Sequence, residues 1–310
     1  MRRARIKPTS DCYMHAYNRA AGSPGFFPFG RKEKRRFVSL LHKLERYYVI
    51  DVVSYQVMSN HFHLVLHVPI EEPSPEETCR RYEKYYCGKR RLRPGSKRCK
   101  AVQKRLRDIS AFMHDLQAQF STWFNSKHDR LGSLWAGRFK NTILEPGLAV
   151  WNCVKYVTMN PVRAQIVSDP GKYRFGSWGA WCATGIHPFK DRATRHLLQA
   201  LPWPLKAADA GDVRQHLQRQ FSQKPPADCE EREKSKEEVR TRVYEPFTTR
   251  VDRKVRYWID GIVIGSRDFV IATLDTFLPS TTGRERVLAS TDRLDPGGTR
   301  LSAYRLRKLA

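Results

Sequence analysis

The chain has 310 residues, 40% of them hydrophobic, which is enough to bury one large core or two smaller ones and argues against global disorder. Its 57 Lys and Arg residues outnumber 31 Asp and Glu residues, and the formal net charge of +26 favours a polyanionic partner. Nucleic acid is the first candidate and an anionic membrane surface is the alternative. The seven cysteines form no Cys-x-x-Cys pair, and no run of about eighteen apolar residues suggests a membrane span, so we expect a cytoplasmic protein with reduced thiols.

The N-terminal part of the chain alternates between strand and helix patterns. Residues 12–20 are expected to form a short strand, and apolar side chains at helical spacing predict a helix over 31–48. The segment 49–58 is rich in β-branched and aromatic residues and predicts a second strand. A tight turn at Ser59 and Asn60 would join it to a partner strand over 61–68, which makes a hairpin.

A basic segment at 79–101 separates this hairpin from the next predicted elements. We expect one long amphipathic helix over 102–126, a strand over 135–144 and a helix over 147–160 that ends at Pro161. The order of strands and helices predicts an α+β domain, in which helices pack on an antiparallel-rich sheet.

The composition divides the chain into three parts. The predicted domain spans 1–185 and includes the basic insertion at 79–101. Residues 186–255 are polar and charged, which is typical of a linker or a loosely structured segment. Residues 256–310 are expected to form a small C-terminal accessory unit with a basic tail, beginning with a strand that ends at Gly265 and a helix capped by Ser266.

The hairpin strand at 61–68 carries histidines on one of its two faces. Alternate side chains of a strand point in opposite directions, so His61, His63 and His67 share a face. The apolar residues of the other face are Phe62, Leu64, Leu66 and Val68. Two imidazoles at positions i and i+2 are close enough to bind one divalent metal ion. The alternative is that these are surface histidines or hydrogen-bonded core histidines.

The predicted helix at 147–160 carries a second pair of candidate residues. Tyr156 and Asn160 are four residues apart and therefore lie on one helical face. A tyrosine at such a position is often a packing residue, so the spacing alone leaves its role open. Asn160 directly precedes Pro161, which disfavours the α conformation and leaves the direction of the Asn160 side chain open.

Four runs of residues resemble a known family in order and spacing. The run SNHFHLVLH at 59–67 resembles the His–hydrophobe–His (HUH) motif of single-tyrosine transposases and endonucleases. The runs LGSLWAGRFKNTILE at 131–145, KYVTMNPVRAQIV at 155–167 and DPGKYRFGSWGAW at 169–181 are similar to the remaining signatures of the REP-associated tyrosine transposase (RAYT) family. The resemblance covers roughly residues 8–185.

The resemblance implies a ferredoxin-like sheet and a metal-dependent DNA endonuclease and transposase. Tyr156 would be the catalytic nucleophile, and His61, His63 and Asn160 would bind Mg²⁺ or Mn²⁺. Insertion-sequence relatives usually have Gln at the position of Asn160, whose reach is shorter. The substrate implied is single-stranded DNA with palindromic hairpin ends, which is cleaved and rejoined through a 5′-phosphotyrosine intermediate. Some relatives act as homodimers, so a homodimer is a further possibility.

Basic side chains near these motifs are candidates for DNA contacts. Arg138 and Lys140 lie on the predicted strand before the catalytic helix, and Arg163 follows that helix. His67 is either a DNA contact or a bystander. The basic stretch at 80–107 contains three interleaved tyrosines, so it either grips single-stranded DNA or is a solvated basic loop.

Two other functions compete with the active transposase. One is a catalytically silent, domesticated DNA-binding relative, and the other is a replication-initiator or relaxase nickase. The presence of every motif residue favours the active transposase over a silent relative. The Asn-Pro-Val-Arg-Ala run, which begins at Asn160, argues against the nickase.

Overall fold

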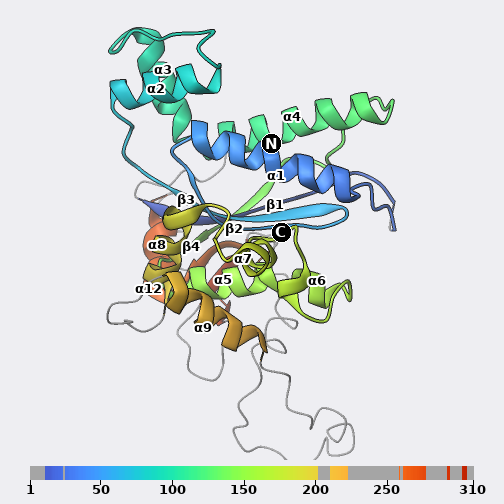
Figure 1. The fold of residues 1–310 in the computed structure, drawn as a ribbon. Coiled ribbons are helices and arrows are strands. Elements are labelled where there is room, and N and C mark those ends of the chain that lie inside the picture. The colour runs from blue at the N-terminus through green and yellow to red at the C-terminus, as the bar shows by residue number, and fades with distance from the viewer. Residues whose placement is uncertain are drawn as a thin grey trace, which may run out of the picture.

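The computed structural model describes most of the N-terminal 200 residues and parts of the C-terminal third. The described residues are 11–23, 25–201, 210–222, 258, 261–276, 292–293 and 302–305. Figure 1 shows a twisted sheet with helices on both faces, so the predicted α+β class is confirmed.

The centre of the molecule is a βαββαβ unit. Its elements are β1 (Cys12–Arg19), α1 (Arg31–Tyr47), β2 (Asp51–Val57), β3 (His61–Val68), α4 (Ile109–Lys127) and β4 (Lys140–Leu144). The strands stand in the order β2-β3-β1-β4, and each neighbouring pair is antiparallel. Helices α1 and α4 cover the same face (Figure 1). This topology is ferredoxin-like, as the family resemblance implied.

The hairpin of β2 and β3 forms where it was expected, and β3 has the predicted bounds. The Met58 amide donates to the carbonyl of His61 at 2.8 Å and closes the turn. Phe62 and Leu64 are fully buried in the core beneath α1 and α4, whereas Val65 belongs to the core of the opposite face. The predicted sorting of β3 side chains into two faces is therefore confirmed.

The segment between β3 and β4 differs from the prediction of one long helix over 102–126. Helices α2 (Pro75–Tyr85) and α3 (Lys97–Leu106) extend away from the sheet (Figure 1), and α4 begins only at Ile109. The break falls at Asp108, whose carboxylate accepts the Ser110 and Ala111 amides. A helix N-cap of this kind starts a new helix and explains why the helix is interrupted although the apolar stripe continues.

The second face of the sheet is covered by helices that follow β4. They are α5 (Leu148–Thr158), α6 (Asn160–Arg163), a 3-10 turn (Pro170–Lys172), α7 (Ser177–Thr184), α8 (Lys190–Ala200) and α9 (Ala210–Ser222). Pro161 does not stop the chain from being helical, because it occupies the first turn of α6, where its missing N–H costs nothing. The predicted strand at 135–144 starts only at Lys140, and Trp135 makes an isolated bridge with Ala20.

The C-terminal part extends the same sheet. Strand β5 (Gly261–Gly265) pairs in parallel with β4, and β7 (Ser302–Arg305) and β6 (Asp292–Arg293) follow beyond it. Helix α12 (Arg267–Asp275) begins at its predicted cap, where the Ser266 hydroxyl accepts the Phe269 amide at 3.2 Å.

Within the predicted linker at 186–255, α8 packs on β2 and α9 contacts α8. Much of that segment lies outside the described residues. The domain boundaries at 185 and 255 remain predictions. Among the described residues, no helix is both long and apolar enough to cross a membrane.

Candidate functional site

A cluster of aromatic rings lies between α5 and the sheet, on the histidine face of β3. The ring centres of His61 and His63 are 5.1 Å apart, and that of Tyr156 on α5 is 5.6 Å from that of His63. His15 of β1 also belongs to the cluster, with its ring centre 5.9 Å from that of Tyr156. The structure thus brings together the two histidines and the tyrosine that the sequence singled out, although they come from segments about ninety residues apart.

A chain of hydrogen bonds fixes the protonation of two of these histidines. His15 Nδ1 lies 2.8 Å from the carbonyl oxygen of Trp258, which can only accept, so Nδ1 carries the proton. The neutral ring of His15 then has an electron pair on Nε2, which accepts a hydrogen bond from Nδ1 of His63 at 2.9 Å. The proton of His63 is therefore on Nδ1, and its Nε2 has the electron pair that a metal ion requires.

A hydrogen bond to Asn60 in the turn holds His61 in the same tautomer, with the proton on Nδ1. Its Nδ1 lies 2.6 Å from the side-chain oxygen of Asn60, an acceptor, so the electron pair is again on Nε2. Burial, and secondarily the nearby Arg19 and Arg163, lower the pKa of His61 to about 4. Burial also lowers the pKa of His63 well below its usual value. Both imidazoles are therefore neutral at pH 7 and present Nε2 as a ligand atom.

Tyr156 is deeply buried, with 1% of its surface exposed. Its ring stacks on that of Trp258, with centres 5.5 Å apart and an interplanar angle of 19°. Burial raises the pKa of the Tyr156 phenol, whereas the positive charge of Arg163 opposes this rise. The Arg163 guanidinium carbon lies 4.3 Å from the ring centre, and Nη2 donates to the Tyr156 carbonyl at 2.7 Å.

Asn160 stands at the junction of α5 and α6, one helical turn beyond Tyr156. Its side-chain nitrogen donates to the carbonyls of Tyr156 at 3.2 Å and Val157 at 3.4 Å. This contact leaves Oδ1 as the atom through which Asn160 would bind a metal ion. Its role as third ligand remains a prediction.

The predicted DNA contacts occupy different environments. Arg138 and Lys140 are exposed, and Lys140 begins β4 opposite Tyr17 of β1. Arg138 precedes the strand instead of lying on it. Arg163 is half-buried over the Tyr156 ring. These three residues remain predicted DNA contacts.

The three tyrosines of the basic segment make contacts within the protein. Tyr82 is buried, and Tyr85 stacks on Tyr47 of α1 with ring centres 4.2 Å apart. The Tyr86 ring lies 4.7 Å from the Arg90 guanidinium carbon. These rings help to attach α2 and α3 to the core, which accounts for their presence without stacking on DNA bases.

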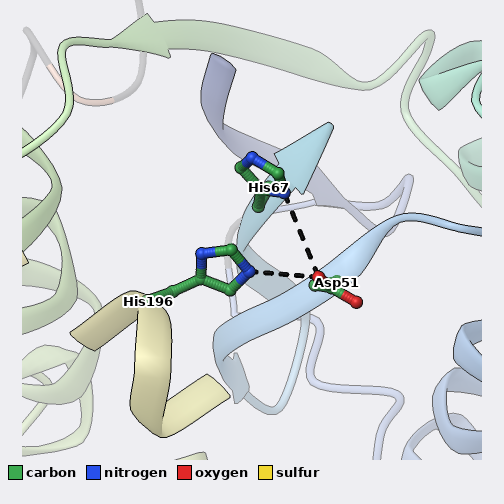
Figure 2. Close-up of side chains that lie close together, drawn as sticks. All are labelled: Asp51, His67 and His196. Carbon is green, nitrogen blue, oxygen red and sulfur yellow. Dashed lines mark hydrogen bonds and ion pairs between the residues drawn. The ribbon is translucent and has the colours of Figure 1, made fainter. Parts of the chain in front are cut away.

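His67 lies in a second cluster on the same face of β3. One ligand atom each from Asp51, His67 and His196 can be chosen so that all three lie within 4.8 Å of one another (Figure 2). Sequence reasoning did not single out Asp51 or His196, because they are brought to His67 only by strand pairing and by the packing of α8. It also missed His15, which the alternation of β1 places on the face of Tyr13 and Tyr17.

Comparisons with known proteins found one similar solved structure. No family model matches the chain, and no curated protein matches it. A solved structure of a REP-associated tyrosine transposase bound to a REP hairpin is similar at 14% sequence identity and a TM-score of 0.40. The similarity covers 67% of this chain and 94% of that chain. At this identity and TM-score, the function rests on the site itself.

Proposed function

We propose that the protein is a metal-dependent single-strand DNA endonuclease and strand transferase that uses Tyr156 as its nucleophile. The observation that carries the proposal is the convergence of His61, His63 and Tyr156 on one face of the sheet. The hydrogen bonds at Nδ1 leave the electron pair of both histidines on Nε2, which is the tautomer that a metal ligand requires. The net charge of +26 fits a DNA substrate.

The residues present suit a divalent metal ion. His61 and His63 would bind it through Nε2 and Asn160 through Oδ1, and two imidazoles favour Mn²⁺ over Mg²⁺. When bound, such an ion polarises the phosphate that is attacked. The absence of a carboxylate from this set leaves the positive charge of the site largely available to a phosphate.

The phenol oxygen of Tyr156 would attack the phosphorus of the DNA backbone. The new bond links tyrosine to the 5′ phosphate, the bond from phosphorus to the 3′ oxygen breaks, and the 3′ oxygen takes up a proton. Attack by a 3′ hydroxyl on the adduct later restores the phosphodiester and releases the tyrosine.

The phenol must lose its proton for this step. An unperturbed phenol with a pKa of about 10 has a deficit of roughly 4 kcal/mol at pH 7, and burial of Tyr156 increases that deficit. Arg163 acts in the opposite direction, because its guanidinium lies over the ring and favours the phenolate.

A DNA strand reaches Tyr156 only after a rearrangement. The tyrosine is 1% exposed and the Trp258 ring stacks against it, so Trp258 must move before a phosphate can approach. Arg138 and Lys140, which are exposed, and Arg163 would then contact the DNA backbone.

The test is the formation of a covalent protein–DNA adduct. The full chain is incubated with single-stranded hairpin oligonucleotides and Mn²⁺, and the adduct is detected by denaturing gel and mass spectrometry. We expect the adduct to disappear in Tyr156→Phe and in His61→Ala. Tyr55→Phe is the matched control, because Tyr55 is also buried but belongs to the core on the opposite face of the sheet. Cleavage that survives Tyr156→Phe would refute the mechanism.

The second candidate is a catalytically silent DNA-binding protein. The burial of Tyr156 beneath Trp258 favours it, because the nucleophile is covered in this structure. The same experiment distinguishes the two functions. Salt-dependent binding of the hairpin by the wild-type chain, without any adduct in Mn²⁺ or Mg²⁺, would establish the silent form.

A further inference from the structure

Two histidines and a carboxylate meet at the opposite end of the histidine face from His61. Asp51 opens β2, and the strand register places it directly opposite His67, near the end of β3. His196 comes from α8 and points toward both (Figure 2). His67 is four residues from His63, which is about 13 Å along a strand, so this cluster is separate from the proposed nuclease site.

The distances between the three side chains suit a common metal ion. Oδ2 of Asp51 lies 3.0 Å from Nε2 of His196 and 4.0 Å from Nδ1 of His67. Ligands of a tetrahedral zinc ion with bonds of about 2.0–2.1 Å are about 3.4 Å apart. The two observed distances lie on either side of that value, so an ion would need only small shifts of the side chains.

His67 contributes an atom that lacks a hydrogen bond. Its Nδ1 is buried and has no hydrogen-bond partner among the described residues, and Asp51 at 4.0 Å is too distant to serve. A buried nitrogen without a partner costs free energy that a metal bond would recover. The His67 and His196 rings stack with centres 4.4 Å apart, which keeps both nitrogens on the side of the carboxylate.

The Nδ1 atom of His196 has partners outside the cluster. It lies 2.9 Å from the Tyr13 hydroxyl, which also lies 3.4 Å from Oε1 of Gln199. Without an ion, Nε2–H of His196 donates to Oδ2 of Asp51 at 3.0 Å, because a carboxylate only accepts, and Nδ1 accepts from the Tyr13 hydroxyl. An ion bound to Nε2 would displace that proton. The ring would then carry its proton on Nδ1 and donate it to the Tyr13 oxygen, while the Tyr13 hydroxyl turns to Gln199.

Asp51 also has a partner on its far side. Arg192 Nη1 lies 3.3 Å from Oδ1 of Asp51 and so leaves Oδ2 to face the histidines. A partner of this kind, which orients a ligand from behind, is a general property of protein metal sites.

We propose that Asp51, His67 and His196 form a zinc site that ties α8 to the β2–β3 hairpin. Two imidazoles and one carboxylate favour Zn²⁺ over Mg²⁺ or Ca²⁺, which prefer oxygen. Two of the ligands stand on paired strands, and the third is on a helix whose buried residues pack against the same sheet face. The ion cross-links these elements, and its fourth position is taken by water.

The experiment isolates this site from the proposed nuclease site. Zinc is titrated into the full chain carrying His61→Ala and His63→Ala, after treatment with EDTA, and bound metal is counted by mass spectrometry. We expect one zinc ion per chain. Binding should weaken by about 100-fold or more when His196→Gln or Asp51→Asn is added, because loss of a ligand costs more than the 10- to 100-fold typical of an outer partner.

Two further variants separate a metal site from an ion-pair cluster. Tyr13→Phe keeps all three ligands but removes the hydroxyl behind His196, so zinc binding should weaken by about 10- to 100-fold. His42→Gln is the matched control, since His42 is a half-buried histidine of α1 outside the cluster, and it should bind zinc like its parent.

Thermal unfolding provides a second readout in the same background. Zinc should raise the melting temperature of the parent variant but not that of Asp51→Asn, and circular dichroism in EDTA confirms that both are folded. The proposal is overturned if the parent binds no zinc, or if His196→Gln and Asp51→Asn bind it as well as the parent. The cluster would then be an ion pair between Asp51 and its neighbours.

Discussion

His15 is the residue whose replacement tests the metal-ready form of His63 most directly. Its ring is fully buried between the Trp258 carbonyl and the His63 imidazole and makes a hydrogen bond to each, at 2.8 and 2.9 Å. His15→Phe fills the space but can make neither bond. His15→Gln retains one acceptor and one donor at similar reach.

The structure sets the size of the expected effect. In His15→Phe, Nδ1–H of His63 and the Trp258 carbonyl lose their partners, and each buried group costs about 1–3 kcal/mol of unfolding free energy. We therefore expect a loss of roughly 2–6 kcal/mol in stability. The affinity for Mn²⁺ should fall about 10- to 100-fold, because His63 is no longer held in one tautomer. His15→Gln should keep most of the stability and most of the affinity for Mn²⁺.

The assay is a titration with Mn²⁺ in which the free ion is followed by electron paramagnetic resonance. All variants carry Asp51→Asn, which removes a ligand of the proposed zinc site. Urea unfolding gives the stability of the same proteins. If His15→Phe binds Mn²⁺ as tightly as its parent while remaining folded, the hydrogen bonds through His15 do not prepare His63 for metal.

Three other predictions test the packing around the site. Trp258→Ala should uncover the proposed nucleophile, so that tetranitromethane nitrates Tyr156 faster in peptide mapping, and should cost about 3–5 kcal/mol of stability. Burial lowers the pKa of His187 to about 3. Below about pH 6.5 the unfolded chain binds this proton whereas the folded chain does not. The free energy of unfolding should therefore decrease as the pH is lowered, by about 2 kcal/mol at pH 5. Urea titrations of His187→Gln should lack this part of the loss. Gly179→Ala should cost about 1–3 kcal/mol by the same measurement, because a Cβ there meets backbone, whereas Gly137→Ala has open space and should cost less.

The features predicted best from the sequence are those set by local patterns. The period of two in β3 gave both the bounds of the strand and the face on which His61 and His63 lie. The cap at Ser266 was also read correctly. The break before α4 was missed because the apolar stripe was followed through Asp108, although an Asp at that position is itself a helix-start signal.

The features that were missed depend on which segments meet in space. His15 joins the site because β1 pairs with β3, and a strand partner cannot be read from the period of either strand. Trp258 and His196 come from segments that were expected to lie in a separate unit or a linker, yet their contacts reach the same sheet face. The two residues are far from their partners in sequence, and no local rule connects them.

The two histidine clusters of β3 differ in charge, and this difference argues for different roles. In the proposed nuclease site, His61 and His63 are neutral, so a bound divalent ion would keep most of its charge for a DNA phosphate. In the proposed zinc site, Asp51 adds a negative charge, which holds an ion more firmly and leaves less charge for a substrate. A single strand with period two can thus supply one site suited to catalysis and one suited to holding α8 in place. Replacing Asp51 should therefore affect stability in zinc and leave Tyr156 adduct formation intact.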